Sequence, residues 1–334
     1  MPRYDKFNFV FFLNSATDYY KFMFYDAFAL SNVRFIEFEA AEMNDDTYLT
    51  FEPYHPVNNP AAFANPQGFD VNAPQAFAQD FPTNDPLAFF FWADDFNLFR
   101  AFDFFNHLRN EYPACKLVLW LTNPIQVYQN LGMFSDKAGT AEIFATFDCV
   151  LTYNQIDAMD FGLTYFDMPY SVLPFEQPQE DVDIFFVGRA MDSLEKILRA
   201  YKTFKASSFT CDFYINDVEN PPPNSKGLHF NEPLSYAEIF EHILNSRAVL
   251  DIIHAQDYGL TLRYFESLAY DKIFITDNSF YRQERFNSPK IFLIDKSLKL
   301  DKKIFLAAAK LPNNYRNEYS PLRMMAFLEF VLNA

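Results

Sequence analysis

The sequence predicts an α/β protein built from two doubly wound, Rossmann-like domains that face each other across a cleft. Short apolar runs of strand length alternate with helical patterns through both halves of the chain, which is typical of this class. The runs are almost continuously apolar, as expected for parallel strands that helices cover on both faces. Three prolines without apolar periodicity at 168–180 separate the halves. Two sheets joined by such a linker imply a cleft, and clefts between domains often bind ligands.

The first domain is expected to span residues 1–170. Its apolar runs predict strands at 7–13, 33–38, 87–92, 116–121 and 149–152. Helical patterns between these runs predict helices at 18–31, 96–112 and 138–147.

The second domain is expected at 181–302, after a linker at 171–180. Its predicted strands are 183–187, 210–215, 227–230, 248–253, 272–276 and 290–294. Its predicted helices are 193–204, 235–245, 261–269 and 302–309, and a last helix is expected at 322–332.

Residues 52–86 form an unusual insertion, rich in Pro, Asn, Ala and Phe, with the loose recurrence NPAAFA, NPQGFD and NAPQAFAQDF. A structureless segment of this length is uncommon inside a domain. It is either a flexible insertion or an arm whose phenylalanines dock on a second subunit, as in a homo-oligomer, or cover the cleft. The sequence leaves both interpretations open.

Charge and cysteine content narrow the function classes. The net charge is −17, which argues against a nucleic-acid binder because that class needs a basic footprint. It also argues against strong attraction to anionic lipid, except through a local patch. The three cysteines are far apart without a CxxC pair, which fits a reducing compartment. Without a signal peptide or an apolar run of about 20 residues, we expect a cytoplasmic protein, at most peripherally associated with the inner face of the membrane.

Two strand ends in the second half carry the candidate binding residues. Gly188 and Arg189 end the strand DIFFVGR before a helix; the glycine permits close approach of a ligand, and the helix start and arginine suit an anion. In the next such segment, QDYGLTLRYFE, a helix opens at Gly259, Leu260 and Thr261.

In that helix, Arg263 could neutralise a phosphate and Glu266 could accept hydrogen bonds from ribose hydroxyls. The alternative is structural: a tight turn with a surface arginine at Arg189, a helix cap at Thr261, and an i, i+3 pair between Arg263 and Glu266. Because both sites follow neighbouring strands of the predicted sheet, they would lie at the same edge, and this favours the binding interpretation.

The chain resembles a known family at these elements. VGR after a strand, then LSYAEIFEHILNSRAVLDI, then GLTLRYFESLAYDKIFITDN look like the nucleotide-sugar domain of GT-B glycosyltransferases of bacterial polysaccharide and lipopolysaccharide biosynthesis. The resemblance spans about 183–295 well and is weaker at FFWADD, LVLWLTNP and FDCVLTYNQIDAMDFGLTYF. It implies that the first domain binds the acceptor, the second binds the donor, and helices at 303–334 pack back toward the first domain.

By this resemblance, Arg189 and Arg263 contact the diphosphate, Glu266 holds the ribose, and the backbone of 259–261 lies against the phosphates. Two departures weaken it. Retaining members often carry a glutamate eight residues before the ribose-binding one, where this chain has Tyr258. They also often have a lysine-glycine pair soon after VGR, where Met191 and Asp192 stand; Arg263 is the candidate replacement for that lysine.

The candidate catalytic residues are Asp94, Asp95 and His254. The two aspartates follow the strand LAFFFW and could act as a base or bind an acceptor hydroxyl; equally, they could be acids at a helix N-terminus. His254 follows the strand AVLDII and could reach the sugar or a phosphate. His229, which ends a strand at GLHF, is expected to face the nucleobase. We see no ligand cluster that demands a metal.

The predicted function is transfer of a sugar from a nucleotide donor, with a UDP- or GDP-sugar favoured, to a glycan or lipid-linked acceptor in surface polysaccharide assembly. No other cofactor is expected to be obligatory. The first alternative is a catalytically degenerate GT-B subunit in glycan assembly, which Tyr258, Met191 and Asp192 favour. A second alternative is a sugar-binding or isomerase-type protein, such as a nucleotide-sugar epimerase, which would convert its substrate without an acceptor.

Overall fold

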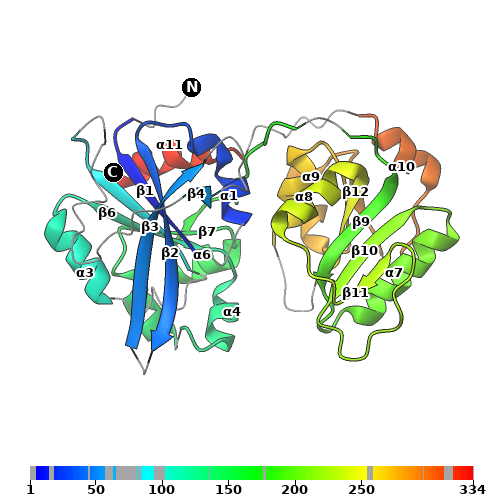
Figure 1. Ribbon diagram of the computed structural model, residues 1–334, viewed down its shortest axis with the longest axis horizontal. Coiled ribbons are helices and arrows are strands. Elements are labelled where there is room, and N and C mark those ends of the chain that lie inside the picture. The colour runs from blue at the N-terminus through cyan, green and yellow to red at the C-terminus, as the bar shows by residue number, and fades with distance from the viewer. Residues whose placement is uncertain are drawn as a thin grey trace. The chain divides into compact units, whose positions relative to one another are not determined.

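The computed structural model divides into two compact units (Figure 1). Unit 1 comprises Met1–Ser171 and Ser320–Ala334, and unit 2 comprises Val172–Tyr319. The residues that the structure describes are 5–14, 19–43, 46–56, 63–64, 81, 84–93, 102–134, 136–175, 178–253, 259–295, 297–311 and 319–333. In these ranges no helix is both long and apolar enough to cross a membrane.

The sheet of unit 1 has the strand order β4-β3-β2-β1-β5-β6-β7-β8. Its strands are β1 (Asn8–Asn14), β2 (Val33–Met43), β3 (Asp46–Pro56), β4 (Phe63–Ala64), β5 (Leu87–Trp92), β6 (Lys116–Leu121), β7 (Cys149–Thr152) and β8 (Thr164–Tyr165). The strands β2, β1, β5, β6, β7 and β8 are parallel, whereas β3 and β4 are antiparallel additions at one edge. The strand order reverses direction between β1 and β5, which makes that position the switch point of this sheet.

The strand β3 corrects our interpretation of the insertion. We expected 52–86 to be a structureless insertion, either flexible or an arm, but its first residues continue β3, which pairs with β2 from Phe35↔Tyr54 to Met43↔Asp46. Only two residues separate the paired ends, so the two strands form a hairpin that the apolar pattern did not reveal. Most of the insertion, including 65–80, lies outside the described residues.

The helices of unit 1 are α1 (Tyr19–Met23), η1 (Tyr25–Ala27), α3 (Phe102–Glu111), α4 (Ile125–Asn130), α5 (Lys137–Phe144), α6 (Gln155–Phe161) and α11 (Pro321–Leu332). The single helix expected at 18–31 is shorter and breaks between α1 and η1. Ser171 explains the break: its hydroxyl donates to the carbonyl of Met23 at 2.8 Å and accepts from the amide of Asp26 at 2.9 Å.

Unit 2 has six parallel strands in the order β11-β10-β9-β12-β13-β14. The strands are β9 (Val182–Arg189), β10 (Cys211–Asn216), β11 (Leu228–Phe230), β12 (Ser246–Asp251), β13 (Ile273–Thr276) and β14 (Ile291–Leu293). Numbered along the chain, this is the 3-2-1-4-5-6 order of a Rossmann sheet, with its switch point between β9 and β12. The predicted doubly wound fold is therefore confirmed.

Helices cover both faces of this sheet. They are α7 (Leu194–Ala206), α8 (Tyr236–Asn245), α9 (Leu262–Ala269), α10 (Lys302–Ala308) and the short turns η3 (Ser279–Arg282) and η4 (Glu284–Phe286). Ile184 of β9 shares one core cluster with Ile197 of α7 and Phe305 of α10. Phe185, the next residue of β9, stacks on His242 of α8 instead, as the alternation of side chains along a strand requires.

The C-terminal segment behaves differently from our expectation for 303–334. The last helix, α11, does return to unit 1, where Glu329 accepts hydrogen bonds from the amides of Lys6 at 2.6 Å and Phe7 at 3.4 Å. Helix α10 stays in unit 2 because Phe305 and Ala308 are buried in that core. Only α11 therefore packs back.

Candidate functional site

The candidate site lies at the carboxyl edge of the sheet in unit 2. The strands β9 and β12 are neighbours there, although two other strands and their connections separate them in sequence. Ligands of doubly wound proteins bind in the crevice outside the carboxyl ends of such strands. The following side chains surround this switch point.

Gly188 and Arg189 end β9, as the sequence predicts. A Cβ atom at position 188 would lie 3.0 Å from the Phe186 ring, so packing against that ring is one reason for the glycine. The Arg189 side chain is 70% exposed and its Nε donates to Asp217, which is itself 50% exposed. An exposed ion pair is weak, so an incoming anion can displace Asp217 from this arginine.

Lys196 is a site residue that our reading of the sequence missed. Its ammonium group donates to the carbonyl of Ile253 at 3.0 Å and to Asp277 at 2.6 Å. Asp277 also accepts from the Ile253 amide at 3.1 Å. The first turn of α7 thus delivers a cation to the carboxyl end of β12, although no lysine-glycine pair follows VGR. Asp192, Lys196 and Arg199 are spaced at i, i+4 and i+7, which is the spacing of residues on one side of a helix. This pattern in the sequence could have indicated Lys196 as a site residue.

The start of α9 is held rigidly by its neighbours. The backbone at Gly259 has a φ of 139°, which L side chains rarely adopt. Its carbonyl accepts from Asn278 Nδ2 at 2.8 Å, and the amide of Thr261 donates to the hydroxyl of Tyr281 at 3.2 Å. Thr261 occupies the N-cap position without a side-chain cap bond, and Leu260 is buried.

Arg263 and Glu266 adopt the structural alternative that the sequence left open. They form an i, i+3 ion pair in which Glu266 has no exposed side-chain surface and Arg263 is 17% exposed. The second carboxylate oxygen of Glu266 accepts from the Tyr236 hydroxyl. Burial is the largest single effect and disfavours the charged guanidinium, but Glu266, Tyr236 and Asp251 together outweigh it and raise the pKa of Arg263. A ribose could reach Glu266 only by displacing one of these partners.

Asp251 is a second residue that we did not single out. It ends β12 with 8% of its surface exposed and accepts from Thr276 Oγ1 at 3.2 Å. Burial raises the pKa of this carboxyl to about 7, although the Thr276 and Thr261 hydroxyls and the charge of Arg263 act in the opposite direction. Strongly shifted carboxyls often mark functional sites. The sequence contains one signal that could have indicated Asp251, namely a polar residue at the end of an apolar strand.

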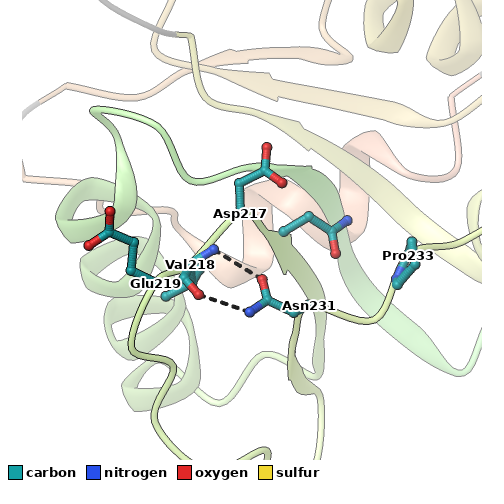
Figure 2. A pocket seen from close by; sticks show the side chains of 6 residues that line it. Asp217, Val218, Glu219, Asn231 and Pro233 are labelled. Carbon is teal, nitrogen blue, oxygen red and sulfur yellow. Dashed lines mark hydrogen bonds between the residues drawn. The ribbon is translucent and has the colours of Figure 1, made fainter.

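One cavity adjoins the switch point beyond β10 and β11, with a volume of about 540 Å³ (Figure 2). It is lined by Asn216, Asp217, Val218, Glu219, Asn231 and Pro233. Asn231 bonds to both the amide and the carbonyl of Val218, at 3.0 and 2.9 Å, and so fixes one wall. Among the described residues Asn216 Oδ1 has no hydrogen-bond partner, and it is buried, so a ligand donor could reach it only if the side chain turns toward the cavity.

A second cavity of about 710 Å³ lies on the other side, beyond β13 and β14. Its lining residues are Asp192, Glu195, Lys196, Arg199, Asp277, Arg282, Ile294, Asp295 and Leu298. In the described part of the chain, neither Arg199 nor Arg282 makes an ion pair. This wall therefore offers both donors and acceptors.

His229 lies in a polar cluster on β10 and β11. Its ring nitrogens lie 3.1 Å from Glu232 and 3.5 Å from Asp212, and its ring stacks on Tyr214 at 4.4 Å. The other oxygen of Asp212 is 2.8 Å from His242. The contact of His229 with a nucleobase stays a prediction.

Three predicted residues cannot be located. Asp94, Asp95 and His254 lie outside the described residues, as does Tyr258.

In unit 1, Asn154 serves a structural purpose, since its side chain caps α6 by accepting from the amides of Ile156 and Asp157. In the ranges given above, no group of three or more His, Cys, Asp and Glu side chains could hold a metal ion.

Comparison with known proteins gives a match in structure but none in sequence. No family model and no curated protein matches the chain. The catalytic domain of starch synthase IV from Arabidopsis thaliana, bound to ADP and acarbose, aligns over 98% of this chain and 100% of its own, with 7% identity and a TM-score of 0.52.

Two further structures match less well. The N-terminal domain of trehalose-6-phosphate phosphatase from Candida albicans aligns over 79% of this chain and 72% of its own, with 10% identity and a TM-score of 0.46. The glycotransferase of kitacinnamycin aligns over 98% and 99%, with 10% identity and a TM-score of 0.42. At these TM-scores we draw no argument from either. The starch synthase domain shows a likeness of fold, which in this chain consists of two α/β units, each with a doubly wound sheet.

Proposed function

We propose that this protein is a glycosyltransferase that moves a sugar from a nucleotide-diphosphate donor to a glycan or glycolipid acceptor. The observation that carries the proposal is the pair of cavities, about 540 and 710 Å³, on either side of the switch point of unit 2. A nucleotide sugar is elongated, with a base and ribose, a charged centre and a sugar. It therefore needs two adjoining polar cavities with cations between them. Fold alone would not justify the activity.

The base and ribose fit the cavity beyond β10 and β11. Asn216 and Asn231 can donate to and accept from the edge of a base, and the carboxylates of Asp217 and Glu219 can accept from ribose hydroxyls. The support for a polar ligand there is the set of amide and carboxylate side chains that line the cavity. This proposal moves ribose recognition away from the buried Glu266.

The diphosphate fits the switch point itself. Lys196 and Arg189 are paired with Asp277 and Asp217, and a diphosphate carries more charge than either carboxylate. It can therefore exchange places with both, while the fixed start of α9 presents backbone N–H groups. When the glycosidic bond to the donor breaks, negative charge develops on the diphosphate oxygens. Cations held at this position stabilise that charge.

Arg263, Glu266 and Asp251 then have a positioning task. They form a buried layer beneath the start of α9. Arg263 donates a hydrogen bond to Glu266, and its positive charge lowers the pKa of Asp251. The second cavity would receive the sugar, because charged side chains such as Glu195 and Arg282 suit sugar hydroxyls. Asp94, Asp95 and His254 stay our predictions for acceptor activation and for contact with the sugar or phosphate.

We place the activity in surface polysaccharide or lipopolysaccharide assembly on the strength of the sequence resemblance, with a UDP- or GDP-sugar as the donor. Two observations favour the alternative of a catalytically degenerate GT-B subunit. Glu266 has no free oxygen and Tyr258 replaces a glutamate, so two family contacts to the donor are altered. Such a subunit would keep the fold and lose turnover.

The test is a thermal-shift screen against UDP, GDP, CMP, dTDP and their sugars, with and without magnesium, followed by calorimetric titration of the best ligand. We expect one nucleotide to raise the apparent melting temperature by mass action. Lys196→Ala should bind it at least about tenfold more weakly, since a charged contact contributes about 1.5–3 kcal/mol. Lys226→Ala, an exposed lysine between β10 and β11, is the matched control.

The outcomes separate the two functions. Failure of every nucleotide to bind a well-folded sample would reject the donor site. Binding that depends on Lys196, without hydrolysis or transfer of the donor sugar to any acceptor in a glycolipid extract, would favour the degenerate subunit. Transfer to such an acceptor would support the enzyme.

A further inference from the structure

Helix α10 has an unusual outer surface. Its inner face is anchored in the core by Phe305 and Ala308. It nevertheless exposes apolar side chains to solvent. Ile304 is 60% exposed and Leu306 is 38% exposed, and Leu311, just after the helix, is 42% exposed. Single exposed apolar residues are ordinary, but three within eight residues are not explained by packing.

Unpaired lysines surround these side chains. Lys299, Lys303 and Lys310 are exposed, and none of them has an ion pair in the described part of the chain. The segment 299–311 contains four lysines and one aspartate, so its formal charge is 4 − 1 = +3, whereas the whole chain carries −17. The one aspartate, Asp301, accepts from the amides of Lys303 and Ile304 and caps the helix.

Helix α10 packs against the residues that follow α7. Lys302 donates to the carbonyl of Ser208, which follows α7, and lies 5.0 Å from the Phe209 ring centre. Phe209 in turn packs edge-on against Phe305 at 5.1 Å. These contacts bring the segment that follows α7 beside α10.

Helix α6 of unit 1 provides an internal contrast. It also exposes two apolar side chains, Ile156 at 49% and Met159 at 77%. Its own charged residues, however, are Asp157 and Asp160. Exposed apolar residues therefore occur elsewhere in the chain without lysines, so the combination on α10 is a specific one.

We propose that the basic face, made of Lys299, Lys303, Lys310, Ile304 and Leu311, docks on an anionic lipid membrane. Lysines attract anionic headgroups, their long side chains adapt to a fluid surface, and the apolar side chains enter the boundary of the acyl chains. The segment 299–311 has a local charge of +3, which is complementary to an anionic lipid surface although the whole chain is acidic. The proposal uses none of the nucleotide-site residues and does not depend on the transferase activity.

The test is co-sedimentation of the full chain with vesicles of pure phosphatidylcholine and with vesicles that contain 30% phosphatidylglycerol. We expect binding to the anionic vesicles alone, and loss of it in 0.5 M salt. Because a lysine near such a surface contributes about 1 kcal/mol, Lys299→Glu/Lys303→Glu/Lys310→Glu should lower the partition coefficient about a hundredfold or more. Ile304→Ser/Leu311→Ser should lower it about tenfold.

Matched control variants test whether a change of exposed apolar surface or of lysine charge elsewhere in the chain has the same effect. Ile156→Ser/Met159→Ser removes exposed apolar surface from α6, and Lys137→Glu/Lys226→Glu reverses lysines elsewhere; both should bind like the wild type, and all variants should keep their circular dichroism spectra. Equal binding of the α10 variants and the wild type would overturn the proposal. So would failure of the wild type to bind anionic vesicles at low salt. Concentration-dependent dimers that the α10 substitutions abolish would assign the surface to self-association instead.

Discussion

Arg189 and Arg263 differ in environment, although the sequence predicts contact with a diphosphate for both. The Arg189 side chain is 70% exposed and pairs with a half-exposed aspartate, while Arg263 is 17% exposed and pairs with a fully buried glutamate. An exposed pair contributes about 0–1 kcal/mol and can exchange partners. A buried pair cannot lose one member without leaving a charge uncompensated. Burial of the partner, more than the position of the arginine, therefore separates a binding residue from a positioning one.

The largest expected effect comes from breaking the buried pair. Arg263→Ala should lower the free energy of unfolding by about 3–5 kcal/mol, because it leaves Glu266 buried beside only the Tyr236 hydroxyl. Urea unfolding followed by circular dichroism measures this value. Arg263→Met/Glu266→Leu, which removes both charges, should recover most of the loss. An Arg263→Ala protein as stable as the wild type would mean that the pair has no structural role.

A second effect concerns Asp251, which lies close to the same pair. Its folded pKa of about 7 is above the unfolded value of 3.8, so the folded state binds more protons between these values. The contribution of Asp251 to stability should therefore be fully present below about pH 4, fall by up to about 4 kcal/mol by pH 7, and change no further above about pH 8.

Asp251→Asn isolates that contribution, since the amide oxygen can still accept from Thr276. The variant should lack this part of the decline between pH 4 and 7 and should be more stable than the wild type at pH 8. Urea unfolding across this pH range checks both expectations. Identical slopes for the two proteins would show that Asp251 titrates normally.

The fold could be predicted from the sequence because its signals are local. Apolar runs such as LAFFFW and AVLDII became β5 and β12, and the helix patterns after Ser193 and Ser235 became α7 and α8. The strand β3 was missed because its residues alternate around prolines and polar groups, and its partner β2 is what stabilises it. A hairpin of this kind depends on pairing more than on local pattern.

The site was predicted less completely, for a physical reason. Strand ends located Gly188, Arg189 and the start of α9 correctly at the carboxyl edge. They could not show that Tyr236, 30 residues before Glu266, occupies one of its oxygens. Nor could they show that Lys196 reaches Ile253, 57 residues later. Such partners are set by how helices pack on the sheet, which no spacing rule in one segment reveals.

A smaller effect should come from the acids that neutralise the exposed cations. Asp277→Asn keeps an oxygen for the Ile253 amide but removes the negative charge beside Lys196. A diphosphate would then no longer compete with that carboxylate, so affinity for the nucleotide should rise about tenfold. Calorimetric titration gives the affinity. Weaker binding would mean that Asp277 orients the lysine more than it competes for it.

The smallest effect is expected for the exposed ion pair of Arg189 and Asp217. Arg189→Ala should change the free energy of unfolding by less than about 0.5 kcal/mol, because the side chain and Asp217 are both largely in solvent. It should weaken nucleotide binding about threefold to fivefold, and the difference from the wild type should shrink in 0.5 M salt because salt screens exposed charges. Unfolding and titration on the same sample measure both quantities. A large loss of stability would place Arg189 with Arg263 among the positioning residues, and the distinction drawn from burial would not hold.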